Sequence, residues 1–252
     1  MNRKYLVASI IASVCCLSSV SFAADPAPVL PPAWHGDAAL GLSLAKGNSD
    51  TLLLSGSAMT HKEWSRNELR LGIDGQYGVN NFGRTNEVRT ADSLHGFIDY
   101  KRLFTNNRLY GSARIDGLYD AVADVHYRVI VGPSLGYYFI KSTNTLLSAE
   151  AGPSFVQERV GDAPSDNHWT LRLSERAEHK FLMGAKVWEQ VDFLPSVDNF
   201  KDYLMKAEVG VEAAINAHLS LRVVAIDQYN SNPAASRKPN DILLISSIVY
   251  KY

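Results

Sequence analysis

The sequence predicts an all-β fold, a transmembrane antiparallel up-and-down β-barrel of about 12 strands with both termini on the periplasmic side. Three observations predict it. The chain begins with an export signal, apolar and polar residues alternate from residue 34 to the end, and aromatic residues gather at the ends of the alternating segments.

The amino terminus is predicted to be a cleaved signal peptide, residues 1–23. Arg3 and Lys4 precede an apolar run over 6–17, and the small-residue site Ser21-Phe22-Ala23 follows. A retained membrane helix is the alternative, but the apolar run is short for a span of roughly 20 residues. A lipoprotein is a weaker one, since no Leu lies three positions before either cysteine. Residues 24–33 are Pro-rich and are expected to form an extended periplasmic tail.

Composition excludes several classes of protein. Cys15 and Cys16 both lie in the predicted signal, so the mature chain has neither a cysteine nucleophile nor a cysteine metal site. Without residues 1–23 the 25 basic residues become 23 against 26 acidic ones, a formal charge of −3, which gives no indication of nucleic-acid binding. The mature chain has no apolar run of helix-spanning length. A soluble β-sandwich and an outer-membrane barrel therefore remain.

Turn-forming clusters divide the alternating region. The short ones lie at 64–67, 105–107, 141–144, 183–185 and 216–218. The longer ones, richer in Gly, Pro, Asn or Asp, lie at 46–50, 79–86, 120–124, 161–167, 196–199 and 230–240. Short and long connections alternate, as in a barrel with tight periplasmic turns and longer external loops, and these connections predict about twelve strands.

Residue parity separates a lipid face from a polar face. In the segment 68–77, Leu69, Leu71 and Ile73 alternate with polar residues, whereas Glu189 breaks the apolar face of 187–193. Aromatics of lipid-face parity lie near the predicted external loops (Tyr77, Tyr119, Tyr127, Phe155, Trp169, Phe193, Tyr203 and Tyr229) and near the opposite rim (Tyr100, Phe139, Tyr250 and Tyr252). Because a membrane barrel places aromatics at both interfaces, this pattern favours the outer-membrane barrel over the sandwich.

A repeated Gly-Pro-Ser tripeptide predicts one register. It occurs at 132–134 and 152–154, on either side of a turn centred near Thr143, so Pro133 and Pro153 should face each other. Because proline lacks an N–H, we expect a mild bulge or bend there, as a packing device or, alternatively, a binding notch.

Charged residues of the second parity are candidates for the lining of the lumen. They are Arg70, Asp74, Arg89, His95, Asp99, Lys101, Arg114, Asp116, Arg128, Glu150, Arg172, Arg176, Glu178, Lys206, Glu208, Glu212 and Arg222. Without the histidine they comprise nine basic and seven acidic residues, a near-balance that argues against a strongly charge-selective pore. The two interpretations are an interior filled by ion pairs and a narrow polar conduit.

Catalytic, metal and cofactor sites are not predicted. None of His35, His61, His95, His126, His168, His179 and His218 belongs to a recognisable nucleophile motif, and Ser93 with His95 on one face is a spacing that chance produces often. Asp162 and Asp166 are expected to be turn formers, with incidental divalent-ion contact to lipopolysaccharide as an alternative. Arg237 and Lys238 are either part of a solvated turn or partners of lipopolysaccharide phosphates.

The segments GLSLAKGNSDT, VGPSLGYYF, LSAEAGPSF and YNSNPAASRKPNDILLISSIVYKY resemble the outer-membrane family called domain of unknown function 481, which includes YdiY-like, salt-induced outer-membrane proteins. The resemblance covers about residues 34–252. It implies an integral outer-membrane barrel of a Gram-negative bacterium and brings no activity to transfer. The expected function is a monomeric barrel, a narrow small-solute channel or a protein of envelope permeability and stress. A closed structural or interaction barrel is the alternative, followed by a lipid-modifying enzyme.

The carboxyl terminus, DILLISSIVYKY, is expected to be the last strand. Ile248, Tyr250 and Tyr252 share its apolar face, which should close against Ala38, Leu40, Leu42 and Leu44 of the first strand. Resemblance to other outer-membrane proteins implies that these three residues are the signal read by the barrel-assembly machinery.

Overall fold

A computed structural model describes residues 33–45, 51–83, 85–104, 107–182 and 184–252. The predicted signal peptide and nearly all of the Pro-rich tail lie outside the described residues. The strands are β1 (Trp34–Ala45), β2 (Thr51–Trp64), β3 (Asn67–Asn80), β4 (Val88–Leu103), β5 (Leu109–Asp120), β6 (Val125–Lys141), β7 (Thr145–Val160), β8 (Asp166–Lys180), β9 (Ala185–Pro195), β10 (Tyr203–Ala214), β11 (Leu219–Asn230) and β12 (Asn240–Lys251).

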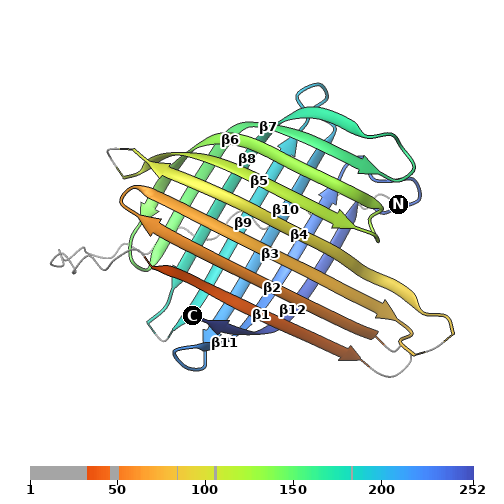
Figure 1. The fold of residues 1–252 in the computed structure, drawn as a ribbon, viewed down its shortest axis with the longest axis horizontal. Helices are drawn as coiled ribbons and strands as arrows, with labels where there is room; N and C mark the ends of the chain where they lie inside the picture. Colours follow the sequence, from red (N-terminus) through yellow and green to blue (C-terminus); the bar gives the residue numbers. More distant parts are fainter. Residues whose placement is uncertain (1–32, 46–50, 84, 105–106, 183) are drawn as a thin grey trace, which may run out of the picture. The chain divides into compact units, whose positions relative to one another are not determined.

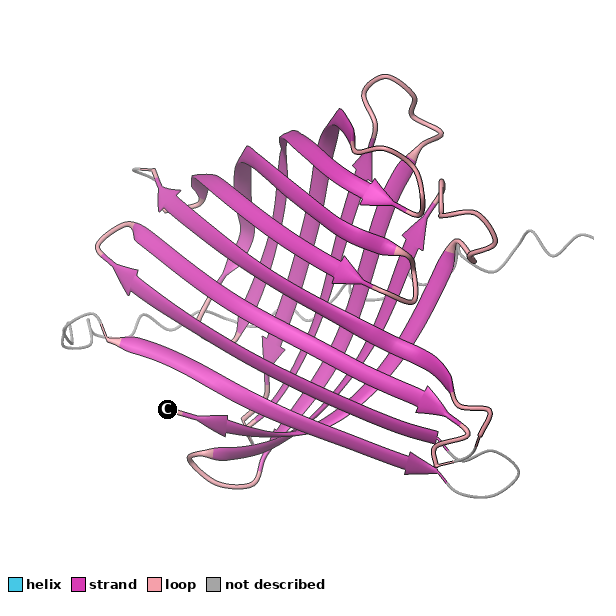
Figure 2. Ribbon diagram, turned by 45° about the vertical axis from the view of Figure 1, so that its right-hand side comes forward, coloured by secondary structure: helices cyan, strands magenta, loops and turns pink. Residues whose placement is uncertain are grey.

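The strands form one closed antiparallel barrel in chain order, in which β12 returns to pair with β1 (Figure 1). This confirms the predicted up-and-down barrel of twelve strands, and all regular structure in the described residues is β (Figure 2). In the same residues no helix is long and apolar enough to cross a membrane.

The two ends of the barrel differ in their connections. The connections 65–66, 104–108, 142–144, 181–184 and 215–218 lie at one end, with Trp34 and Tyr252; we call it the short-turn end. The connections 81–87, 121–124, 161–165, 196–202 and 231–239 lie at the other, which we call the long-loop end. Short and long connections alternate at nearly the predicted positions.

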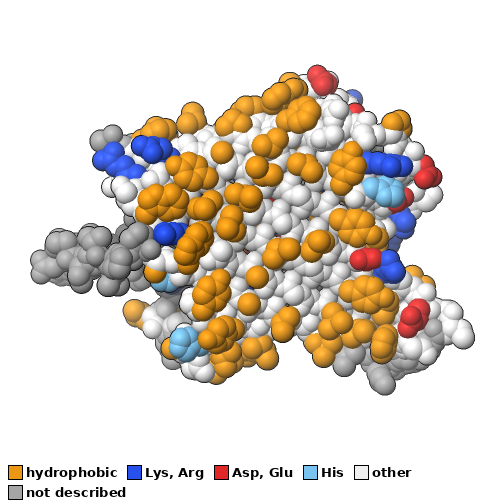
Figure 3. Space-filling view, in the orientation of Figure 1, with side chains coloured by type: hydrophobic (Ala, Val, Ile, Leu, Met, Phe, Trp, Pro, Cys, Tyr) orange, Lys and Arg blue, Asp and Glu red, His pale blue; other side chains and the backbone are white. Residues whose placement is uncertain are grey.

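Side chains of one parity cover the outside of the barrel with apolar surface. Leu40, Ile73, Leu135 and Ile248 are among them and are between 53 and 76% exposed. Figure 3 shows hydrophobic side chains spread over the wall, whereas charged side chains gather mostly at the two ends. A soluble protein would cover such a surface, so the outer face is built for an apolar environment.

Aromatic rings form belts near both ends, as the sequence predicts. Toward the long-loop end the Phe155 and Trp169 rings lie 5.3 Å apart, and Tyr203 stacks on Tyr229 at 5.3 Å. Toward the short-turn end, Trp64 lies 6.4 Å from Tyr100. Neighbouring strands supply both pairs at the long-loop end, whereas Trp64 of β2 and Tyr100 of β4 approach each other across β3.

Two carboxylates interrupt the apolar outside on β8 and β9. Glu175 is opposite Val191, and Glu189 is opposite Ala177, so the two residues are diagonal neighbours on the outer face. Glu189 is the residue that obscures the alternation of β9 in the sequence.

The Gly-Pro-Ser segments face each other across β6 and β7. Val131 pairs with Phe155 and Leu135 with Ala151, so one register holds on both sides of Pro133 and Pro153. A bulge at the prolines is wrong, because the register shifts lie near the strand ends, between Val125 and Tyr127 and between Tyr138 and Ile140. The ladder is nevertheless interrupted over 132–134, and the alternative of a local bend stays a prediction.

The seam between β1 and β12 is only half as long as expected. Ladder pairing runs from Asp37 with Lys251 to Leu40 with Ile248, and Gly36 exchanges backbone hydrogen bonds with Tyr252 just before it. Beyond Leu40 no further pair forms between these strands in the described part of the chain. Ala38 and Leu40 therefore match the last strand as predicted, whereas Leu42 does not; the side chain of Leu44 is outside the description.

Candidate functional site

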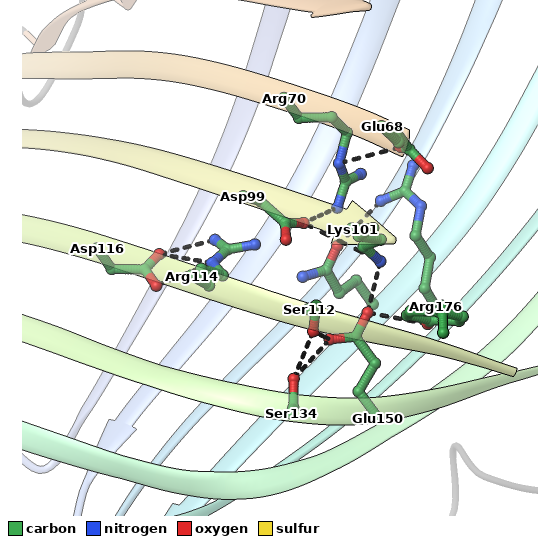
Figure 4. A network of polar contacts seen from close by, with 12 residues as sticks. Glu68, Arg70, Asp99, Lys101, Ser112, Arg114, Asp116, Ser134, Glu150 and Arg176 are labelled. Carbon is green, nitrogen blue, oxygen red and sulfur yellow. Dashed lines mark hydrogen bonds and ion pairs between the residues drawn. The ribbon is translucent and has the colours of Figure 1, made fainter. Parts of the chain in front are cut away.

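The lumen is the candidate site, and its short-turn half is filled by ion pairs from β3 to β8 (Figure 4). Arg70 Nη2 donates to Asp99 Oδ2 at 2.6 Å, and Lys101 Nζ lies 4.0 Å from the same oxygen. Lys101 also donates to Glu150 Oε1. Asp99 is 3% and Lys101 5% exposed, so these charges are withdrawn from water and need their partners.

Neutral hydroxyl groups complete the coordination of Glu150. Tyr110 Oη donates to Oε1 at 2.9 Å, and Ser112 Oγ donates to Oε2 at 3.2 Å. Ser112 and Ser134 hydroxyls are 2.6 Å apart, which links β5 to β6. Glu150 is thus held by three strands besides its own, and a solute passing here would have to displace it.

Apolar rings seal the wall beside this network. The rings of Tyr110 and Tyr138 are 4.6 Å apart, and both side chains are nearly inaccessible inside the barrel. Leu103 is buried with them and Leu146 packs against the cluster. This corner of the short-turn half is therefore a packed core.

Arg114 and Arg172 form a second polar network, which we call the arginine layer and which reaches across the barrel from β8 to β5. Arg172 Nη2 donates to Asp192 Oδ1 of β9 at 2.7 Å, and Arg172 Nη1 lies 3.9 Å from Asp116 Oδ2 of β5. Asp116 also accepts three hydrogen bonds from Arg114, at 2.7, 2.8 and 3.0 Å. Because β6 and β7 separate β5 from β8, the Arg172–Asp116 contact closes over the inner faces of those two strands.

Small residues on β6 and β7 leave the space for this contact. At Gly132 an added Cβ would lie 2.3 Å from the Pro153 carbonyl oxygen, and at Gly152 it would lie 2.2 Å from that of Pro133. Ser134 and Ser154 are the neighbouring inward residues. At the repeated Gly-Pro-Ser the backbones of β6 and β7 therefore come close together beneath the arginine layer. This favours a packing role for the motif over a binding notch.

Three inward rings lie on inward glycines of the next strand. A Cβ at Gly72, Gly136 or Gly210 would lie 2.0 to 2.3 Å from the ring of Phe97, Tyr110 or Trp188, respectively. A cation covers each ring: Arg114 lies 4.5 Å from Phe97, Lys101 4.8 Å from Tyr110 and Lys186 5.0 Å from Trp188. These stacks fix long cationic side chains in the lumen.

A separate network ties the seam at the short-turn end. Arg222 Nη2 lies 2.8 Å from Glu212 Oε2 and 3.0 Å from Asp37 Oδ1, and Lys251 pairs with Glu212. These four residues come from β11, β10, β1 and β12. The ion pairs thus bridge the point where the two ends of the sheet meet.

A cavity of about 370 Å³ runs along the lumen, from Pro233 and Lys238 at the long-loop end to Asp37, Lys186 and Arg222 in the short-turn half. His95 lies in its wall between Asp74, at 2.9 Å, and Asp116, at 3.3 Å. Lys206 also lines the cavity, and in the described part of the chain its ammonium group has no hydrogen bond or ion pair. The cavity has the volume of a small-molecule site and mixed charge around it.

The loop 231–239 folds toward the mouth of this cavity. Pro233 and Lys238 line the cavity, and Ala234 is buried beside Gly161 of the neighbouring loop, where a Cβ would lie 3.5 Å from the Ala234 Cβ. Lys238 is therefore turned to the lumen, a position that the sequence interpretation of this loop did not include.

Most of the charged residues selected by parity lie inside the barrel in these networks or around the cavity: Arg70, Asp74, Asp99, Arg114, Asp116, Arg128, Glu150, Arg172, Arg176, Glu178, Lys206, Glu208, Glu212 and Arg222. Glu208 accepts a hydrogen bond from Trp188, and Glu178 pairs with Arg176.

Arg89 is a correction. A register shift between Gly78 and Val79 places Arg89 opposite Val79, on the outer face. There it pairs with Asp92 and lies over the Tyr77 ring at 5.8 Å, with its side chain 52% exposed. The bulge changes the face of every residue beyond it, so strict parity fails at this end of β4.

Asp37, Asp192 and Trp188 are lumenal residues that the sequence prediction omitted. Asp192 and Trp188 share parity in β9, where the outward Glu189 made the pattern ambiguous. Asp37 has the inward parity of β1 and was detectable on that basis.

One group near the long-loop end has metal-ligand chemistry. Ligand atoms of Glu158, Asp166 and His168 all lie within 4.8 Å of one another. Arg128 already donates to Glu158, so a cation of the protein occupies that carboxylate. We assign no metal to this group.

A closed antiparallel barrel with an apolar, aromatic-rimmed outside and a charged inside has the architecture of outer-membrane β-barrel proteins. The family model described as "Protein of unknown function, DUF481" matches residues 38–252, and the chain belongs to this family. No curated protein matches the chain by sequence.

Solved structures with a similar fold are themselves outer-membrane proteins. The NanC porin is similar with a TM-score of 0.50 at 5% identity, over 87% of this chain and 98% of that one. The translocator domain of the autotransporter NalP from Neisseria meningitidis has a TM-score of 0.45 at 8% identity, over 87 and 86%. At such identities the likeness shows the fold alone.

Proposed function

We propose that this protein is a monomeric outer-membrane barrel that passes small solutes at low conductance, because ion pairs occupy the short-turn half of its lumen. The single observation that carries the proposal is the combination of two features: a cavity that runs along the lumen, and a buried network of Arg70, Asp99, Lys101 and Glu150 that narrows the lumen in the short-turn half. A solute entering the cavity meets paired charges of both signs.

Mixed charge has a defined consequence for permeation. Rings of one sign select ions strongly, whereas alternating Arg114, Asp116, Arg172 and Asp192 give each passing ion both attractive and repulsive neighbours. We therefore expect weak selectivity and small single-channel steps. Displacement of a paired side chain in the network would gate the path.

Planar-bilayer recording tests this proposal. The double variant Lys101→Ala/Glu150→Ala removes both partners of one buried pair, so it leaves no single charge unpaired between them. We expect wild-type steps that are small and ohmic, and steps roughly threefold larger or more in the variant. The matched control is Arg89→Ala/Asp92→Ala, an ion pair on the outer face, which should leave conductance unchanged.

The second candidate is a barrel with a closed lumen and a structural or interaction role. The buried Tyr110–Tyr138 cluster favours it, since this corner has the packing of a core. If neither wild type nor the double variant conducts at high protein load, while both are folded, the conduit is wrong and the closed barrel stands.

The remaining assignments belong to the same proposal. An outer-membrane location implies a cleaved signal at 1–23, contact with lipids and lipopolysaccharide, and assembly through the barrel-assembly machinery by way of Ile248, Tyr250 and Tyr252. We assign no cofactor and no catalytic role; incubation with phospholipid and lipopolysaccharide followed by mass spectrometry tests the lipid-modifying alternative. Salt induction, which the YdiY-like proteins imply, is testable from transcript levels in high and low salt.

A further inference from the structure

The long-loop half of the β1–β12 seam is open. The last pair is Leu40 with Ile248, and Gly41 still lies next to the chain of β12, since a Cβ there would be 2.5 Å from the Ser246 carbonyl oxygen. Beyond this point the two strands diverge in both ribbon views (Figures 1 and 2). Each keeps its other neighbour in full: β1 pairs with β2 as far as Ala45, and β12 pairs with β11 as far as Asn240.

An open seam in a membrane requires an occupant. The edges 41–45 and 240–247 present backbone N–H and C=O groups that have no ladder partner on that side among the described residues. Hydrocarbon cannot form hydrogen bonds with these backbone groups. Water or the polar part of a lipid-like molecule must therefore bind them.

The aromatic belt is interrupted at the same place. Toward the long-loop end, outward aromatics lie on β3 and on each strand from β5 to β11. In the described residues none lies there on β4, nor on the three consecutive strands β12, β1 and β2. Ile242, Leu244, Leu42 and Leu54 occupy the outside there, with 46 to 73% of each exposed. The strands beside the opening thus present aliphatic surface where the rest of the barrel presents rings.

Inside, the lumen wall beside the seam carries aliphatic side chains among polar ones, whereas the opposite wall carries three arginines. The cavity lining near the seam includes Ala39, Val224, Ile226 and Ile245 together with Ser55, Ser57, Asp241 and Ser247. The far wall carries Arg114, Arg128 and Arg172. The cavity therefore has aliphatic surface beside the opening and arginines across from it.

Two cationic side chains that line this cavity have a nitrogen without a hydrogen-bond partner in the described part of the chain. Arg128 is 8% exposed, and its Nη2 has no hydrogen-bond partner in the described part of the chain, although Nε is bound to Glu158. The Lys206 ammonium is likewise without a partner there and lines the same cavity. A buried guanidinium nitrogen left unpaired indicates a site for an acceptor.

We propose that the open half of the seam is a lateral passage through which a single-chain anionic amphiphile, such as a fatty acid, moves between the membrane and the lumen. Its chain lies along the aliphatic side chains beside β12, and its anionic head is bound by Lys206 and Arg128. The proposal rests on the outer-membrane location given above, and it does not require conduction through the short-turn half.

Engineered cysteines test the opening itself, because residues 24–252 contain none. The pair Leu40→Cys/Ile248→Cys lies in the hydrogen-bonded half and should form a disulfide under mild oxidation. The pair Ser43→Cys/Ile245→Cys, three residues further along the same register and beyond the contact of Gly41 with Ser246, should not, and should be joined only by a long bis-maleimide. Equal disulfide yields in liposomes would show that the seam closes and would overturn the proposal. A Ser43→Cys disulfide between two molecules would show a second copy at the edge, which also overturns it.

Fluorescence quenching tests the ligand. Trp188 lines the cavity, whereas Trp34, Trp64 and Trp169 lie on outward positions and are replaced by Phe. In vesicles, dibromostearate should quench Trp188 saturably, and oleate should compete, whereas oleyl alcohol should compete at least fivefold more weakly. Lys206→Gln should raise the half-saturation concentration at least fivefold.

The matched control is Lys62→Gln, a lysine near the short-turn end over the Trp34 position, which should leave half-saturation unchanged. Quenching that rises linearly with probe, or that Lys206→Gln leaves unaltered, would overturn the proposal. These readouts use protein already in vesicles and record no current, so their failure is distinguishable from failure of the conduit or of the location.

Discussion

The two halves of this barrel treat charge in opposite ways. In the short-turn half, Lys101 and Glu150 are buried, paired and backed by hydroxyls, and ion pairs of Arg222 and Glu212 tie the seam. In the long-loop half, Lys206 has no partner in the described residues and the seam is unpaired beyond Leu40. The same strands run through both halves of the barrel. The two halves therefore differ because of their local side chains and the pairing at the β1–β12 seam.

That difference separates stability from access. A buried ion pair stabilises the folded protein little compared with apolar packing, but removal of one partner leaves a buried charge unpaired and is destabilising. The stability of the short-turn half should therefore be sensitive to single substitutions. Unpaired groups are available to a ligand. Substitutions in the long-loop half should therefore change the free energy of unfolding little and should change the affinity for a ligand. The predictions below follow this contrast from the largest expected effect to the smallest.

Removal of one partner from the buried network should have the largest effect. Lys101→Met leaves Glu150 buried beside Tyr110 without its cation, and we expect a loss of about 3 kcal/mol in the free energy of unfolding. Urea unfolding in liposomes, followed by tryptophan fluorescence, measures it. Lys101→Met/Glu150→Leu should recover part of the loss; if the double variant is the less stable, the charge is not the cause.

Filling a glycine beneath a lumenal ring should have the next largest effect. At Gly210 a Cβ would lie 2.0 Å from the Trp188 ring, so Gly210→Ala should lower the free energy of unfolding by about 1 to 3 kcal/mol. Gly117→Ala is the control, because nothing lies within 4 Å of its Cβ position. Equal unfolding curves for the two variants would refute the tight ring–glycine contact.

Deletion of Tyr252 should reduce assembly. Its backbone exchanges hydrogen bonds with Gly36 at 3.1 and 3.3 Å, and a Cβ at Gly36 would meet its ring, so it completes the paired half of the seam. We expect a severalfold lower amount of heat-modifiable protein in the outer-membrane fraction. Normal assembly without Tyr252 would remove the assembly role.

Neutralising two lumenal arginines should have a smaller effect. Arg172→Gln/Arg176→Gln should shift the reversal potential toward cation preference in a salt gradient, because two positive charges leave the path. Unchanged selectivity would exclude both residues from the conduit.

Removal of the outer ion pair between Arg89 and Asp92 should have the smallest effect. Arg89→Ala should change the free energy of unfolding by about 0 to 1 kcal/mol, because exposed ion pairs contribute little to stability.

Much of the fold follows from the sequence because alternation and turn residues fix strands and faces independently. Arg70, Asp99 and Arg172 could be placed inside by parity alone. Arg89 could not, because one bulge reverses parity beyond it. The contact of Arg172 with Asp116 depends on how strongly the barrel curves between β5 and β8, which no periodicity encodes.

The seam shows the same limit more clearly. DILLISSIVYKY alternates throughout and predicts full pairing with the first strand, yet only its last residues pair with β1. Strand propensity reports how a segment packs and not which neighbour covers its edge. An unpaired edge can therefore be recognised only from the three-dimensional arrangement.

Thiol accessibility from the two halves tests the central contrast most directly. Ser93→Cys lines the cavity toward the long-loop end, whereas Ser112→Cys replaces a 7% exposed hydroxyl inside the Glu150 network. In intact liposomes a membrane-impermeant charged thiol reagent should modify Ser93→Cys at least tenfold faster than Ser112→Cys. Equal rates would show that water and solutes reach both positions alike, and would contradict a lumen that is open along the cavity and filled by ion pairs between β3 and β8 in the short-turn half.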